Sequence, residues 1–159
     1  MSPDSGSDNA TERRKAGPRT AEKVGVERWI EGVFFGCAEV AILGLPALFS
    51  LLDASANAEV KLAAIVALST AAIAIGTIRT GWTRLSWPPL TPRLLLARAV
   101  VHNLLVLVAA YGGATIDLLS GSALGSAAFA VLVAAGTVWV FPQITAHAST
   151  LPSWWKWGP

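Results

Sequence analysis

Four long apolar stretches dominate the pattern of hydrophobic and polar positions along the chain. They cover roughly residues 32–52, 62–80, 94–119 and 123–141. A helix needs about 20 residues to cross roughly 30 Å of hydrocarbon, so each stretch is long enough or just sufficient. Strands are not expected, because the stretches lack period-two alternation and are rich in Ala and Leu. The pattern predicts an all-α protein of the membrane, with four transmembrane helices in a compact bundle.

The segments outside these stretches are polar or rich in Trp. Residues 1–28 hold too few large apolar side chains to offset the entropy of ordering, which predicts a disordered to juxtamembrane basic tail. The four-span bundle then covers 29–143, and a short Trp-rich tail covers 144–159. Only 14% of the residues are charged, against about 25% in soluble domains, which agrees with extensive lipid contact.

The distribution of Lys and Arg predicts how the chain is threaded. With the N-terminus inside, every one of the 12 Lys and Arg residues except Lys61 falls on the inner side. Such an excess marks the cytoplasmic side, so both termini are expected there. The net charge of +2 is too small to suggest a nucleic-acid partner.

The inner connection, residues 80–93, carries aromatic and basic side chains that suit the headgroup region. We expect these residues to contact anionic inner-leaflet lipids or a cytoplasmic partner: Trp82, Arg84, Trp87 and Arg93.

Small residues mark the faces through which the helices are expected to pack. Gly32 and Gly36 form a GxxxG motif in the first span, and the other spans carry stripes rich in Ala. Close approach of backbones is what holds helices together in lipid. The sequence therefore predicts self-association or packing against other membrane subunits.

A few polar groups lie inside the predicted spans and need partners. Glu39 lies on the stripe of Gly32 and Gly36, and the predicted partners are Arg98, His102 and Thr70. Ionisable groups inside a membrane are costly and are usually turned inward and paired. Three interpretations of Glu39 remain open: a pairing residue that locks the bundle, a proton-carrying residue that works with His102, or a contact with another subunit.

No catalytic chemistry is indicated. The sequence has no GxSxG, HExxH or phosphate-binding Gly-rich motif, so no enzyme activity is expected. The single cysteine, Cys37, rules out an intrachain disulfide and a CxxC metal site, and no metal or cofactor is expected. One alternative is a membrane-anchor subunit that binds haem or quinone through His102.

One short stretch has a local resemblance to a known family. Residues 36–44, GCAEVAILG, look like the first helix of the small multidrug resistance transporters, which have four spans and a membrane-embedded Glu. The match covers only Ala38, Glu39, Val40 and nearby glycines. The chain departs from that family in its long basic inner loop and in a third span without Trp, so no family is assigned.

The sequence thus favours a structural or accessory role in a membrane complex or envelope. The alternative is a small proton-coupled transporter or channel that uses Glu39 and His102.

Overall fold

The computed structural model describes residues 25–89 and 91–149, and within these ranges it is helical, with no strand. The helices are α2 (Val26–Leu43), α3 (Leu45–Ser50), α4 (Asn57–Arg79), α5 (Pro92–Ser120) and α6 (Ala123–Ser149). Of the tails predicted at residues 1–28 and 144–159, the parts at 1–24 and 150–159 lie outside the described residues. An all-helical fold is therefore shown, as the sequence predicts.

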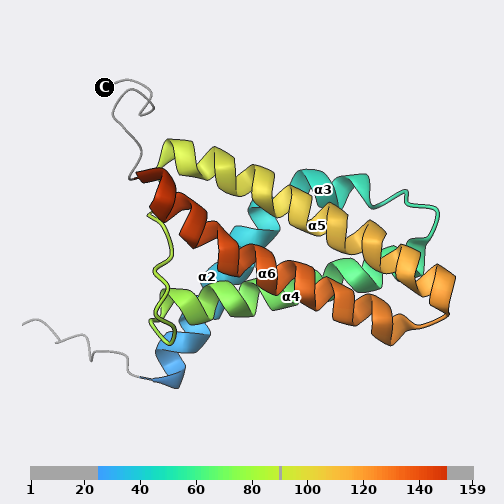
Figure 1. Cartoon of the computed structure of the whole chain (residues 1–159), viewed down its shortest axis with the longest axis horizontal. Helices are drawn as coiled ribbons and strands as arrows, with labels where there is room; N and C mark the ends of the chain where they lie inside the picture. The colour runs from blue at the N-terminus through green and yellow to red at the C-terminus, as the bar shows by residue number, and fades with distance from the viewer. Residues whose placement is uncertain (1–24, 90, 150–159) are drawn as a thin grey trace, which may run out of the picture.

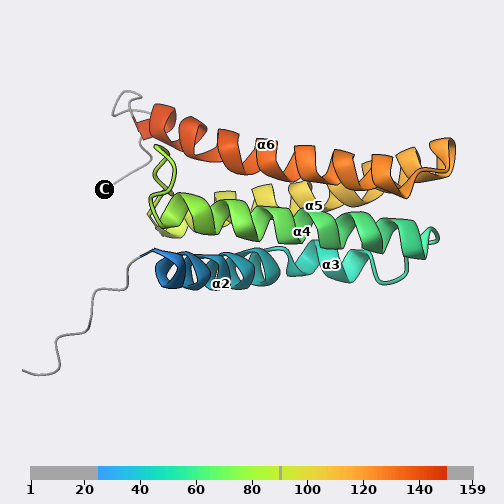
Figure 2. The ribbon, with the colours of Figure 1, turned by 90° about the horizontal axis from the view of Figure 1, so that it is seen from below.

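The helices form a layered bundle whose central member is α4. Figure 2 shows α2 and α3 in one layer and α6 on the opposite side of α4. Helix α4 contacts α2, α5 and α6, and its small residues Ala63, Ala67 and Ala71 are fully buried. The polypeptide enters α2 and leaves α6 at the same end of the bundle (Figure 1). We call this the basic end, where α4 also ends and α5 begins, and we call the opposite end the far end.

Three helices, not four, are long and apolar enough to cross a membrane. They cover Ala58–Arg79, Leu94–Ser120 and Ala123–His147. The first predicted span, residues 32–52, is wrong as one continuous helix, because it breaks at Gly44 between α2 and α3. Pro46 lies in the first turn of α3. Pro is favoured at a helix start, and within a helix its missing N–H and its clash with the preceding turn weaken the helix.

The other helix ends differ from the sequence prediction by a few residues. Helix α5 begins two residues earlier than expected, and the hydroxyl of Thr91 accepts a hydrogen bond from the Leu94 N–H at 3.4 Å. Helix α6 does not stop at 141 but continues through Pro142 to Ser149. The segment assigned to the C-terminal tail therefore starts as helix.

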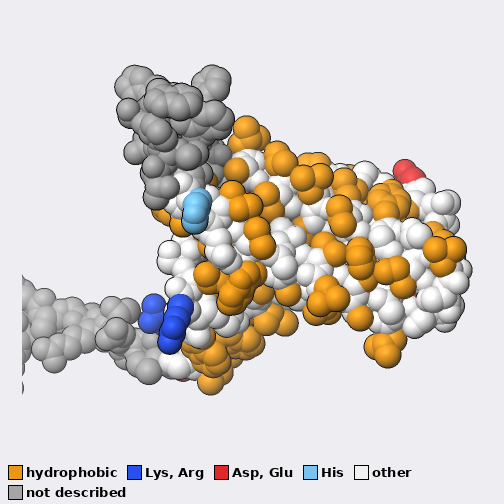
Figure 3. All heavy atoms as spheres, in the orientation of Figure 1, with side chains coloured by type: hydrophobic (Ala, Val, Ile, Leu, Met, Phe, Trp, Pro, Cys, Tyr) orange, Lys and Arg blue, Asp and Glu red, His pale blue; other side chains and the backbone are white. Residues whose placement is uncertain are grey.

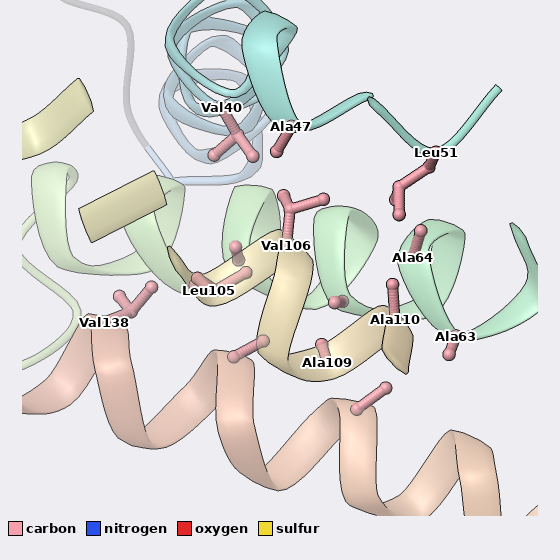
Figure 4. Close-up of a cluster of buried hydrophobic side chains, with 14 of the residues drawn as sticks. Val40, Ala47, Leu51, Ala63, Ala64, Leu105, Val106, Ala109, Ala110 and Val138 are labelled. Atoms are coloured by element: carbon pink, nitrogen blue, oxygen red, sulfur yellow. The ribbon is translucent and has the colours of Figure 1, made fainter. Parts of the chain in front are cut away.

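The interior and the surface are both apolar. Figure 4 shows Val40, Ala47 and Val106 meeting where α2, α3 and α5 approach one another. Large apolar side chains also cover the outside, and in Figure 3 they spread along the face between the two ends. An exposed apolar surface of this extent indicates contact with a lipid bilayer.

Candidate functional site: an ionic cluster at the basic end

Glu39 is the centre of an ionic cluster that joins three helices. One carboxylate oxygen of Glu39 on α2 accepts a hydrogen bond from the Arg98 guanidinium on α5 at 3.1 Å. The other oxygen accepts one from Arg79, at the end of α4. The Glu39 side chain is only 7% exposed, so this carboxylate is held almost entirely by protein groups.

Arg98 is the most deeply buried member, with a side chain 1% exposed. Besides Glu39, its guanidinium donates to the carbonyl oxygen of Pro88 in the connection between α4 and α5. It also lies over the ring of Trp87, 5.4 Å from the ring centroid, within the range of a cation–π contact. Arg98 therefore ties the connecting loop to the helices.

His102 lies one turn beyond Arg98 on α5 and is buried. Its Nδ1 atom is 2.7 Å from the backbone oxygen of Arg98, so its hydrogen bond stays within its own helix. The structure does not show a direct bond between His102 and Glu39.

Thr70 is not part of the cluster. Its hydroxyl donates to the carbonyl oxygen of Val66 in its own helix at 2.8 Å. The partner that α4 supplies is Arg79, nine residues and about 14 Å further along the helix. From the sequence, Arg79 is expected to be one of the charges at the inner membrane surface. The structure shows that its side chain turns inward and binds Glu39.

The two glycines of the GxxxG motif lie where α2 and α4 touch. A Cβ atom at Gly32 would stand 2.9 Å from the Gly76 carbonyl oxygen, and one at Gly36 would stand 2.5 Å from that of Ala72. No side chain fits in these gaps. The close approach of the two backbones brings α2 into a position from which Glu39 meets the arginines.

Asn103 is the site residue that sequence reasoning missed. In an unbroken helix the Ala47 N–H would donate to the Leu43 carbonyl oxygen. Here the Asn103 side chain stands between them: its Oδ1 accepts from the Ala47 N–H at 2.7 Å, and its Nδ2 donates to the Leu43 oxygen at 2.8 Å. Nδ2 also donates to the Ala99 oxygen at 2.7 Å. The amide thus replaces the hydrogen bond that the break between α2 and α3 removes. In the sequence, the feature that could have indicated this role is an Asn inside an apolar helix.

The residues predicted to contact lipid or a partner are distributed around the same end. Trp82 and Arg84 are exposed, whereas Trp87 is half-buried and packs on Phe141 at 5.7 Å between ring centroids. Trp82 stacks with Trp29 of α2 at 6.1 Å. The side chain of Arg93 lies outside the described residues.

The cluster links three helices through ion pairs and carries more positive than negative charge. Two guanidiniums face one carboxylate, so the three groups sum to +1 when ionised. Removing one partner from a buried ion pair is strongly destabilising, because it leaves an uncompensated charge. Within 25–89 and 91–149 no group of His, Cys, Asp or Glu side chains is arranged to hold a metal ion.

Comparison with known proteins gives a family but no activity. The chain belongs to a family described as a domain of unknown function (DUF8215), whose match covers residues 23–148. The match includes all the described helices almost to the end of α6. No curated protein and no solved structure matches the chain.

Proposed function

We propose that this chain is a small polytopic membrane protein with a structural or accessory role, in which the ionic cluster locks the helices together. The observation that carries the proposal is the double engagement of Glu39. Both of its carboxylate oxygens are bound by guanidiniums from other helices. A carboxylate held in this way is suited to fixing the helices in place.

In this proposal α2 and α3 together form a fourth, broken crossing. They run from the basic end to the far end alongside α4 (Figure 2). Their outward side chains are large and apolar, as a lipid-facing surface requires: Phe34, Phe35, Ile42, Leu45 and Phe49 are all exposed. At the break between them, Asn103 binds the free backbone N–H of Ala47 and carbonyl oxygen of Leu43. Backbone polar groups within a membrane need such protein partners, because hydrocarbon offers no hydrogen bonds.

The distribution of buried polar groups supports a structural role over transport. Among the described residues, the buried polar or charged groups are Thr80, Arg98, His102 and the Glu39 side chain toward the basic end, and Ser126 near the far end. Ser126 packs at Gly113, eleven residues and about 16 Å along α5 from His102. The buried α5 positions between them are Leu105, Val106, Ala109 and Ala110. A path for protons or polar solutes requires polar groups along its length.

Partners of the bundle are part of the proposal. Beside Gly136 on α6, the space that a Cβ would occupy is open to 4 Å. A groove of about 340 Å³ lined by Val101, Gly136 and Val140 runs there. This surface is suited to a second copy or another membrane subunit, in a complex or envelope.

The test is reconstitution of the full chain into vesicles that contain a pH-sensitive dye. The structural role predicts that an imposed pH gradient decays at the same rate with the wild type, with Glu39→Gln and with empty vesicles. It also predicts that Glu39→Gln lowers the amount of folded protein in the membrane, whereas Glu27→Gln, at an exposed position of the same helix, does not. Rapid decay with the wild type that Glu39→Gln abolishes would instead support the transporter alternative.

A further inference from the structure

A pocket opens beside the ionic cluster. It has a volume of about 410 Å³ and is lined by Arg79, Ser86, Trp87, Pro88 and Arg98, among others. Ser86 is exposed, and Arg98 forms part of the buried wall. The pocket therefore connects the surface of the loop to the two guanidiniums.

The charges around this pocket favour an anion. Both arginines line it, whereas Glu39 is not among the residues that do so. The carboxylate neutralises only one of the two positive charges. An anion in the pocket would balance the second charge, and guanidinium groups bind phosphate oxygens with favourable geometry.

Unsatisfied hydrogen-bond donors lie in the same wall. In the part of the chain that the structure describes, four buried side-chain polar atoms have no hydrogen-bond partner. Two of them, Arg98 Nε and Trp87 Nε1, belong to residues that line this pocket, and both can only donate. Buried donors without partners are costly, so this wall lacks an acceptor.

The pocket lies at the level where lipid headgroups are expected. The apolar span of α4 ends at Arg79, and that of α5 begins at Leu94. The pocket is built from the end of the first, the start of the second and the loop between them.

We propose that this pocket binds one phosphate group of net negative charge, as carried by an anionic phospholipid headgroup or by free phosphate. Arg79 contacts the phosphate near the opening, and Arg98 and Trp87 face it from the wall. This inference rests on the membrane location in the proposed function, and it adds a specific site to the general attraction between a basic surface and anionic lipid.

The test measures lipid bound to the full chain in detergent micelles. Native mass spectrometry gives the fraction of protein that carries one phosphatidylglycerol, with phosphatidylcholine as the zwitterionic comparison. Arg79→Gln is expected to weaken retention of phosphatidylglycerol about tenfold, because a hydrogen bond to a charged group contributes at least the free energy of a tenfold change. Arg28→Gln on α2 is the matched control, since it removes the same charge from an exposed position that does not line the pocket.

A second variant keeps the test valid if Arg79→Gln disturbs the cluster. Ser86→Phe places a bulky ring at an exposed position of the pocket without touching a charged group. It is expected to lower retention of phosphatidylglycerol while the protein stays folded. Retention that is equal in wild type, Arg79→Gln, Ser86→Phe and Arg28→Gln would overturn the pocket site and leave the structural role intact. Proton flux in the vesicle assay would overturn the structural role and leave the lipid measurement unaffected.

Inorganic phosphate distinguishes the two sources of the ligand. If about 10 mM phosphate leaves the bound lipid in place, the lipid headgroup is the occupant. If phosphate displaces the lipid from the wild type and Arg79→Gln abolishes this competition, the site is a phosphate site whose occupant is the free ion.

Discussion

The hydrogen bonds of Asn103 give a sharp prediction about the broken first crossing. Its amide joins the last carbonyl of α2 to an N–H of α3, and makes a third bond within α5. Asn103→Leu keeps a similar volume and removes all three bonds. Leu43 O and Ala47 N–H are then left without a partner next to hydrocarbon.

The magnitude of the effect follows from these bonds. Side-chain hydrogen bonds within membrane proteins average about 0.6 kcal/mol, so three bonds give about 2 kcal/mol. The two orphaned backbone groups raise this toward about 4 kcal/mol, since each buried unsatisfied group costs about 1–3 kcal/mol. We therefore expect Asn103→Leu to lower the free energy of unfolding by about 2–4 kcal/mol.

The assay is reversible unfolding of the protein in mixed micelles, together with hydrogen exchange at the Ala47 amide. Exchange is expected to accelerate in Asn103→Leu, because the amide loses its acceptor. Thr70→Val is the control, since the Thr70 hydroxyl bonds only within its own helix, and its effect is expected to stay within about 0.5 kcal/mol. The reasoning is refuted if both variants have the same stability and the exchange at Ala47 is unchanged.

Two further predictions concern the contacts of α2 with its neighbours. Gly36→Ala is expected to lower the free energy of unfolding by about 1–3 kcal/mol, because the new methyl group overpacks against the Ala72 carbonyl. Gly136→Ala, where the space is open, is expected to leave this free energy unchanged or to raise it by up to about 1 kcal/mol. Unfolding midpoints check both. Trp29→Phe removes the hydrogen bond from Nε1 to the Thr77 hydroxyl at 3.1 Å and is expected to cost about 1 kcal/mol; an unfolding curve that overlays the wild type would contradict this.

The helical class and the rough positions of the helices could be predicted from the sequence. Apolar runs of sufficient length determine both, and the Gly32–Gly36 motif lies at a helix contact because only backbone fits there. The break in the first span could not be read from hydropathy alone. Residues 45–52 stay apolar across it, and Pro46 alone does not distinguish a kinked helix from an interrupted one.

The partners of Glu39 were only partly predictable. The helical stripe containing Arg98 and His102 pointed to Arg98, since residues three and four apart share a helix face. Arg79 could not be predicted as a partner of Glu39, because a long side chain at a helix end can turn either outward to the headgroups or inward. The role of Asn103 depends on a gap in a different helix, which no spacing within α5 reveals.

The central claim is that an ionic cluster couples α2 to α5, and a double-mutant cycle between Glu39 and Arg98 tests it most directly. The free energy of unfolding is measured for the wild type, Glu39→Gln, Arg98→Gln and the double variant. Because Arg98 is buried and its guanidinium lies 3.1 Å from the carboxylate, we predict a coupling energy of about 2–3 kcal/mol. A coupling below about 0.5 kcal/mol, as found for independent sites, would contradict the account.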